Sequence, residues 1–234
     1  MKSSISLRIS LLVLVFLGSI NTLQAQFKVV GYIRPKADLM PDLEKVDLSK
    51  ITHLNIAFIN PDTSGVFKDM PFLKDVVAYA HKRKVKVLMS CGGGSRQKYY
   101  GKLLADGRRP ALVKNFVEFV KKYKLDGIDV DLEGDDIDDN YEAFVTELRD
   151  GLGKKKLLTA ALAFYTRKRI TDVALQQLDF INAMAYDKTG HWRPNDPGQH
   201  SPMSYALDHL NYWSKERNIA KEKVIIGVPF YGYG

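Results

Sequence analysis

Three acidic residues, each separated from the next by one residue, are the feature of this sequence best suited to chemistry. Asp129, Asp131 and Glu133 alternate with single apolar residues. Side chains on a β-strand point alternately to opposite faces, so the three acids are predicted to share one face. Carboxylates gathered in a poorly hydrated interior do not all ionise readily, and we expect at least one proton to be retained or shared. A carboxyl group held protonated near neutral pH is what general acid catalysis requires.

Two other interpretations of these acids stay open at the level of sequence. The acids are solvated and cap the following helix, as the acids within 135–139 are able to do. Alternatively, they occupy positions 1, 3 and 5 of an EF-hand calcium loop with Gly134 at position 6, although Asn140 stands at position 12, where a bidentate glutamate is needed. The alternation with apolar residues favours a strand over both interpretations.

The elements that must position the acids are short apolar segments separated by helical patterns. The predicted strands are 29–33, 53–59, 85–89, 127–132, 157–163, 180–186 and 224–230. Apolar residues recur at helical spacing over 72–83, 111–123, 141–152 and 205–217, with boundary signals at Pro71, Pro110 and Gly153. Strands that alternate with helices predict a parallel sheet with helical crossovers.

Two architectures contain such a sheet, an open doubly wound sheet and a (β/α)8 barrel. A doubly wound nucleotide site needs a glycine-rich turn after the first strand, and residues 32–35 contain no glycine. Unusual polar or glycine residues instead lie at the ends of several strands, at 90–94, 129–133 and 186–187. Barrel enzymes place their chemistry at those strand ends. We therefore predict an α/β fold, a (β/α)8 TIM barrel that stops before its eighth strand at Gly234.

The first 25 residues have the pattern of a secretory signal peptide. Lys2 and Arg8 precede an apolar run at 11–18, and Ala25 offers a small residue at the cleavage point. The apolar run is shorter than the roughly 20 residues that span a bilayer. We expect cleavage after Ala25, one catalytic barrel over 26–234, no stable membrane insertion, and a secreted or periplasmic location.

The chain carries a formal net charge of +8 and contains one cysteine in 234 residues. Its basic residues form short clusters beside apolar segments, such as 82–84, 121–122 and 154–156. This distribution indicates solvated helix ends and no nucleic-acid partner. Cys91 has no partner for an internal disulfide. His191 and His200 lack metal-ligand partners at helical spacing, and we expect neither a metal nor a cofactor.

The run 126–133 resembles the Asp-Gly-x-Asp-x-Asp-x-Glu signature of family 18 glycoside hydrolases, the chitinases and endo-β-N-acetylglucosaminidases. Four further segments are similar to motifs of that family, in the family's order: 29–32, Ser90-Cys91-Gly92-Gly93, Met184-Ala185-Tyr186-Asp187 and 227–232. The resemblance extends from about residue 29 to the C-terminus. Two features depart from the family pattern. The family commonly has arginine where this sequence has Tyr233, and it has an eighth strand with a pocket tryptophan, which this sequence does not include.

The resemblance implies a retaining hydrolase of β-1,4-linked N-acetylglucosamine chains, in which the acetamido oxygen of the substrate attacks the anomeric carbon. Glu133 would protonate the leaving oxygen and later deprotonate the incoming water. Asp131 would orient the acetamido group and stabilise the charge of the intermediate, while Asp129 would hold or share a proton with Asp131. Tyr186 would donate its hydroxyl to the acetamido group.

The resemblance also implies residues that bind the sugar: Tyr32, Phe58, Gly92, Gly93, Met184 and Asp187. Tyr165 and Trp192 are further candidates, by residue type, for stacking on sugars beyond the cleavage point. The expected partner is a polysaccharide or glycan that contains N-acetylglucosamine. Action on chitin, action as an endo-β-N-acetylglucosaminidase on the chitobiose core of N-glycans, and a non-catalytic glycan-binding role all stay open.

Overall fold

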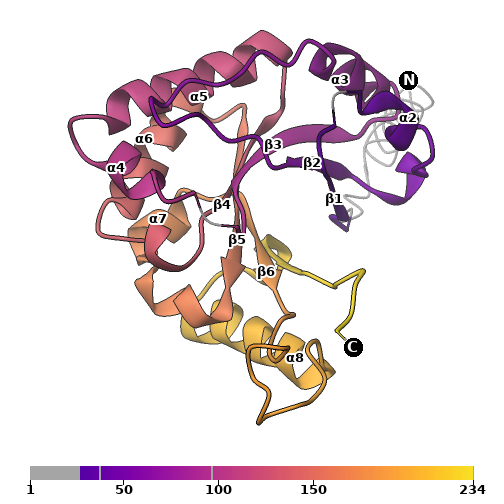
Figure 1. Ribbon diagram of the computed structural model, residues 1–234, viewed down its shortest axis with the longest axis vertical. Helices are drawn as coiled ribbons and strands as arrows, with labels where there is room; N and C mark the ends of the chain where they lie inside the picture. Colours follow the sequence, from indigo (N-terminus) through magenta and orange to yellow (C-terminus); the bar gives the residue numbers. More distant parts are fainter. Residues whose placement is uncertain (1–26, 37, 96, 234) are drawn as a thin grey trace, which may run out of the picture.

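The computed structural model describes residues 27–36, 38–95 and 97–233, and the predicted signal peptide lies outside them. Seven parallel strands form one curved sheet in chain order (Figure 1). Within the described residues β1 does not pair with β7, so the barrel is open between these two strands. The strands are β1 Val30–Ile33, β2 His53–Ala57, β3 Lys86–Gly92, β4 Gly127–Asp131, β5 Leu157–Ala163, β6 Phe180–Met184 and β7 Val224–Ile226.

Helices connect the strands and cover the outer face of the sheet (Figure 1). They are α2 Met40–Leu43, α3 Leu73–His81, α4 Tyr100–Leu104, α5 Arg109–Tyr123, α6 Tyr141–Leu152, α7 Asp172–Gln176 and α8 Met203–Asn211. Shorter helical turns are η1 Leu48–Lys50, η2 Gly134–Asp136, η3 Phe164–Arg169, η4 Tyr212–Glu216 and η5 Lys221–Lys223. In the part of the chain that the structure describes, no helix combines the length and the apolar character needed to cross a bilayer.

Helix α6 shows how the sequence sets an element that covers the sheet. Its buried residues recur at helical spacing and are Tyr141, Phe144, Val145, Leu148 and Leu152. Gly153 ends the helix with a φ of 65°, a conformation that costs glycine little. The bounds predicted for this helix and for strand β5 are confirmed.

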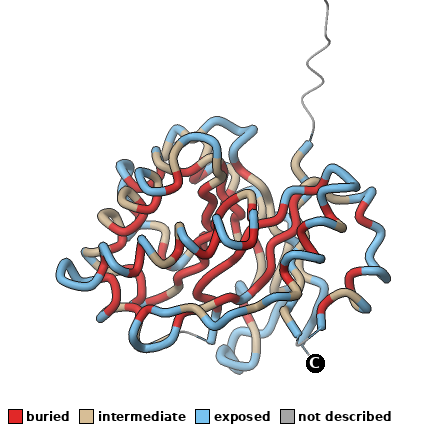
Figure 2. The backbone as a smooth tube through the Cα atoms, turned by 90° about the horizontal axis from the view of Figure 1, so that it is seen from above, coloured by how far each residue is buried: buried red, intermediate tan, exposed pale blue. Residues whose placement is uncertain are grey.

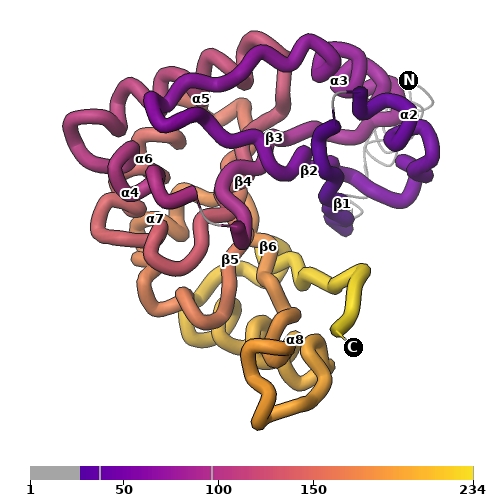
Figure 3. The backbone as a smooth tube through the Cα atoms, in the orientation of Figure 1, coloured from indigo at the N-terminus to yellow at the C-terminus, as the bar shows by residue number. Residues whose placement is uncertain are grey.

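The predicted seventh strand is too long. Only 224–226 pair with β6, whereas the sequence pattern extended the strand to residue 230. Gly227 N–H still donates to the Ala183 carbonyl at 2.8 Å, but Pro229 has no N–H to offer to a ladder. The trace beyond β7 then leaves the sheet (Figure 3). An apolar run alone does not make a strand without a neighbouring strand to pair with it.

The register of the central strands brings polar residues into one layer of the interior. Ser90 on β3 pairs with Asp129 on β4, and Asp129 pairs with Thr159 on β5. The neighbouring Ile128 and Val130 are fully buried and belong to the apolar core. Figure 2 shows the same division, with buried strands inside and exposed helical surfaces outside. The predicted alternation of the two faces along β4 is confirmed.

Candidate active site

The acidic residues of β4 lead from the barrel interior to its C-terminal mouth. Asp129 is fully buried, Asp131 is 5% exposed, and Glu133 is only partly buried. Glu133 follows the strand, and its backbone is still extended, with φ −131° and ψ 155°. The alternation of side chains therefore continues to Glu133, and all three carboxyl groups come from one face. This strand geometry rules out the helix-loop-helix arrangement of an EF-hand.

Asp129 is held by hydrogen bonds from four other strands. Tyr32 Oη and Ser90 Oγ donate to its Oδ2 at 2.9 and 2.8 Å. Thr159 Oγ1 and Asn182 Nδ2 donate to its Oδ1 at 2.6 and 3.1 Å. Burial raises the pKa of Asp129, and these four donors act in the opposite direction because they favour the ionised form. Two donors on each oxygen fit a carboxylate that acts only as an acceptor.

Asp131 has a different environment. Its Oδ1 is buried and has no hydrogen-bond partner among the described residues. Burial, followed by the charges of Glu133 and Asp129, raises the pKa of Asp131 well above its ordinary value. Nothing comparable to the four donors of Asp129 opposes this shift. Of the two buried acids, Asp131 is therefore the better place for the retained proton.

Glu133 lies at the mouth, beside an aromatic residue from the neighbouring strand end. Tyr165, in η3 directly after β5, donates its hydroxyl to Glu133 Oε2 at 3.2 Å. Tyr165 is 67% exposed, so its ring is open to a ligand that approaches Glu133. The sequence suggested Tyr165 only as a sugar-stacking residue, and the structure adds a direct contact with the proposed acid.

Gly92 and Gly93 let the chain pass closely beside Asp131. Both have a φ in the left-handed region, 98° and 95°. A Cβ on Gly92 would lie 2.2 Å from the carbonyl oxygen of Asp131, and a Cβ on Gly93 would lie 2.4 Å from the ring of Phe58. Gly93 N–H also donates to the Asp131 carbonyl at 2.8 Å. The two glycines thus serve close backbone packing next to an acid of the site, a role that the sequence left undecided.

The end of β6 supplies a second wall of the site. Burial raises the pKa of Tyr186, and the charge of Asp131 adds to the shift, so the phenol stays protonated and can donate a hydrogen bond. Met184 ends β6 and is partly buried. Asp187 has a φ of 57° and accepts hydrogen bonds from Tyr231 Oη at 2.7 Å and Tyr233 Oη at 2.9 Å. Tyr233, which departs from the family pattern, thereby joins the segment after β7 to the β6 turn.

The remaining predicted binding residues lie around the same mouth. Tyr32 is 43% exposed, yet its hydroxyl end reaches the buried Asp129. Phe58 is 36% exposed and faces Gly93. Trp192 lies farther out, in an aromatic group with His191 and Tyr233, with ring centroids 5.0 and 5.2 Å away.

Three positioning residues were not predicted from the sequence. Thr159 and Asn182 bind Asp129 from β5 and β6, and each is a single polar residue within an apolar strand segment. Such an isolated polar residue was the signal available. Asn60 accepts from Gly92 N–H at 2.7 Å and donates to the Gly92 carbonyl at 3.0 Å. Asn60 belongs to a loop, and no sequence pattern marked it.

Comparisons with known proteins agree with this geometry. Residues 28–234 match the profile of glycosyl hydrolases family 18. A family 18 chitinase from the chitin utilization locus of Flavobacterium johnsoniae has a similar structure, with a TM-score of 0.79 and 40% identity over 87% of this chain and 68% of that chain. A chitinase from Bacteroides thetaiotaomicron gives a TM-score of 0.74 and 27% identity over 89% and 69% of the two chains.

Curated relatives have lower identity and are longer. A chitinase-like effector of Moniliophthora roreri is 30% identical over 226 residues, which cover 82% of this chain and 55% of the relative. An endochitinase of Manduca sexta is 26% identical over 81% of this chain and 41% of its own length. The chain thus spans about half the length of these relatives. The family match and the barrel structure confirm the predicted resemblance, and the chain belongs to glycosyl hydrolases family 18.

Proposed function

We propose that this protein hydrolyses β-1,4-linked N-acetylglucosamine chains, as in chitin or chito-oligosaccharides, with retention of configuration. The observation that carries the proposal is the graded environment of the three acids. Asp129 is surrounded by donors, Asp131 is buried with a strongly raised pKa, and Glu133 reaches the mouth. The names of the family relatives, which include chitinases, support the same substrate class.

In family 18 the acetamido oxygen of the substrate attacks the anomeric carbon. We assign this step to the substrate here as well, and Asp131 orients that acetamido group by accepting a hydrogen bond from its N–H. The raised pKa of Asp131 supports a proton shared between Asp131 and Glu133. When the proton is on Glu133, it is available to the departing glycosidic oxygen, and Asp131 is left as a carboxylate beside the positive charge of the cyclic intermediate.

Tyr186 and Glu133 complete the reaction. The protonated phenol of Tyr186 donates to the acetamido oxygen and fixes it in a near-attack position. After the bond to the leaving group breaks, Glu133 is a carboxylate and takes a proton from water. The water adds to the anomeric carbon from the face that the leaving group vacated. Two successive inversions at one carbon give the β-anomer as the first product.

The location and domain organisation belong to the same proposal. We propose a signal peptide over residues 1–25, a catalytic barrel over 26–234, and a secreted or periplasmic protein. Among the relatives, a secreted chitinase of Penicillium expansum is 27% identical over 88% of this chain and 16% of its own length.

The test compares wild type with Glu133→Gln and with Glu118→Gln, an exposed glutamate on outer helix α5. On chito-oligosaccharides we expect Glu133→Gln to lose about 10²- to 10⁴-fold in rate, the usual contribution of a general acid or base, with little change in melting temperature. Glu118→Gln should keep wild-type activity. Hydrolysis by Glu133→Gln within severalfold of wild type would refute the assignment.

Two further readouts separate the alternatives. NMR of the first product distinguishes the β-anomer, expected here, from the α-anomer, which contradicts a retaining mechanism. Cleavage of an N-glycan chitobiose core but not of chito-oligosaccharides indicates an endo-β-N-acetylglucosaminidase. Binding of chito-oligosaccharides without cleavage by wild type indicates a non-catalytic role.

A further inference from the structure

The end of the sheet opposite the candidate active site carries a strong excess of positive charge. In a parallel sheet every connection from a helix to the next strand lies at this end. Four of these six connections, 82–86, 121–126, 150–156 and 221–223, contain twelve basic residues and three acidic ones, whereas the other two, 44–52 and 177–179, contain two basic residues and three acidic ones. The excess of nine in the four connections is larger than the net charge of +8 of the whole chain. We call these four connections the basic end.

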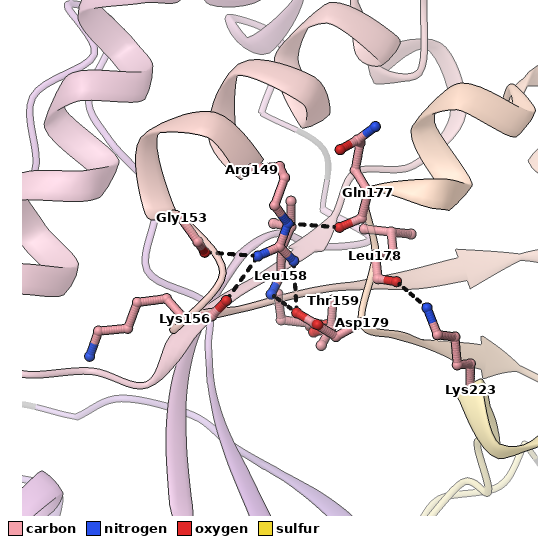
Figure 4. A network of polar contacts seen from close by, with 10 residues as sticks. Arg149, Gly153, Lys156, Leu158, Thr159, Gln177, Leu178, Asp179 and Lys223 are labelled. Atoms are coloured by element: carbon pink, nitrogen blue, oxygen red, sulfur yellow. Dashed lines mark hydrogen bonds and ion pairs between the residues drawn. The ribbon is translucent and has the colours of Figure 1, made fainter.

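Hydrogen bonds join the connections of the basic end into one surface. Asp126 Oδ2 accepts from Val87 N–H at 2.7 Å, which ties the first connection to the second. The Lys156 ammonium donates to the Leu125 carbonyl, which ties the second to the third. Arg149 donates to the carbonyls of Lys156 and Gln177 at 2.9 and 3.0 Å (Figure 4).

The last connection is joined in the same way. Lys223 Nζ donates to the Leu178 carbonyl at 3.2 Å (Figure 4). Lys28, just before β1, donates to the Glu222 carbonyl at 3.0 Å. The four connections are therefore linked from β3 to β7, and residues 177 and 178, which lie outside the basic end, join the third connection to the fourth.

Most of these charges are available to a partner. Nine lysines of the basic end are exposed and form no ion pair within the described residues: Lys82, Lys84, Lys86, Lys121, Lys124, Lys154, Lys155, Lys221 and Lys223. Lys122 is the exception, because it pairs with Asp69 at 2.8 Å. Asp126 is engaged by His81 at 2.7 Å. The local acids do not neutralise the lysines.

Helix dipoles explain only part of this charge. A cation near a helix C-terminus is favourable, but the effect is confined to the last turn. Lys121 and Lys122 lie in the last turn of α5. In contrast, Lys86 lies within β3, and Lys154 and Lys155 follow Gly153, where α6 has already ended. These lysines do not stabilise a helix end and are free for another purpose.

We propose that the basic end docks the protein on a surface of anionic lipid head groups and leaves the active-site mouth facing away from that surface. The charges are spread over four connections at one end of the sheet and do not line a single narrow groove. This distribution suits a broad surface of phosphates. The four connections expose no large apolar side chain, so the contact is electrostatic and does not insert into the bilayer. A polymeric substrate would still reach the opposite end.

The test measures binding of the full chain to vesicles by sedimentation. The vesicles contain phosphatidylcholine alone or phosphatidylcholine mixed with phosphatidylglycerol. Wild type is compared with a basic-end variant, Lys82→Gln, Lys84→Gln and Lys86→Gln combined. The matched control combines Lys98→Gln, Lys168→Gln and Lys188→Gln, three exposed lysines that follow strands β3, β5 and β6 at the opposite end. All variants share the same N-terminal segment, so any contribution from it cancels.

We expect wild type and the control to bind the anionic vesicles at about 0.1 M salt and to be released at about 1 M salt, where the Debye length falls from about 10 to about 3 Å. Each basic residue near an anionic surface contributes about fivefold to partitioning, so the basic-end variant should bind roughly a hundredfold more weakly. Equal binding to neutral vesicles, equal losses in both variants, or binding to heparin but to no vesicle would overturn the proposal.

Discussion

Replacing Gly92 with alanine should unfold the site locally, because the obstacle is backbone and not a movable side chain. The new methyl group would lie 2.2 Å from the carbonyl oxygen of Asp131 and 2.7 Å from its carbonyl carbon. Ordinary contact requires about 1 Å more. The carbonyl cannot retreat freely, since it accepts the Gly93 N–H hydrogen bond at 2.8 Å. Strand β4 must therefore move where it carries Asp131.

The size of the effect follows from three contributions. A non-glycine residue at a φ of 98° costs about 1–3 kcal/mol. Overpacking a tight site costs about 1–3 kcal/mol, and loss of the Gly93 hydrogen bond about 0.5–1.5 kcal/mol. Together they amount to roughly 3–7 kcal/mol, a large part of the 5–15 kcal/mol of a typical domain. Displacing Asp131 by about 1 Å should also reduce hydrolysis about a hundredfold.

Two matched glycine substitutions separate these contributions. Gly93→Ala has the same backbone strain, but its methyl group meets the ring of the partly exposed Phe58, which can turn away, so it should cost less than Gly92→Ala. Gly107→Ala meets nothing within 4 Å and should be neutral. Thermal unfolding followed by circular dichroism, with hydrolysis assayed in parallel, measures all three. If Gly92→Ala melts within about 1 °C of Gly107→Ala, our account of this contact is wrong, because about 2–4 °C is expected per kcal/mol.

Two other predictions concern buried ionisable groups. Asp131→Asn should abolish hydrolysis and raise the melting temperature at pH 7, because it removes a buried carboxyl group whose pKa is raised in the folded protein. The gain should shrink toward pH 4, where the unfolded chain also begins to hold this proton. A lower melting temperature of the variant at pH 7 would contradict this account. Burial lowers the pKa of His209 to about 4, with the charge of Arg167 adding to the shift. Between pH 6.5 and 4 the unfolded chain therefore binds a proton at His209 that the folded chain does not bind, and wild type should lose stability as the pH falls through this range. His209→Gln should flatten the slope of unfolding free energy against pH. An unchanged slope would show that His209 is not responsible.

The sequence by itself determined the features that depend on local periodicity. The period-two alternation along β4 predicted that Asp129, Asp131 and Glu133 share a face. A one-residue shift of the strand would move the three acids to the face that packs against the helices and the apolar residues to the barrel interior. Apolar spacing and Gly153 predicted α6 within its observed bounds. The short helices α2, α4 and α7 were missed, since four or five residues are too few to display a helical period.

Tertiary structure decided what each carboxyl group experiences. Asp129 is bound by Tyr32, Ser90, Thr159 and Asn182, which lie between 30 and 97 positions away in the sequence and meet only when the strands assemble in register. The extent of β7 was likewise decided by pairing with β6. The basic end combines 221–223 with three clusters that the sequence indicated only as separate solvated helix ends. Electrostatic and hydrogen-bond energies depend on distances through space, and the parallel sheet sets those distances by bringing remote segments to one end.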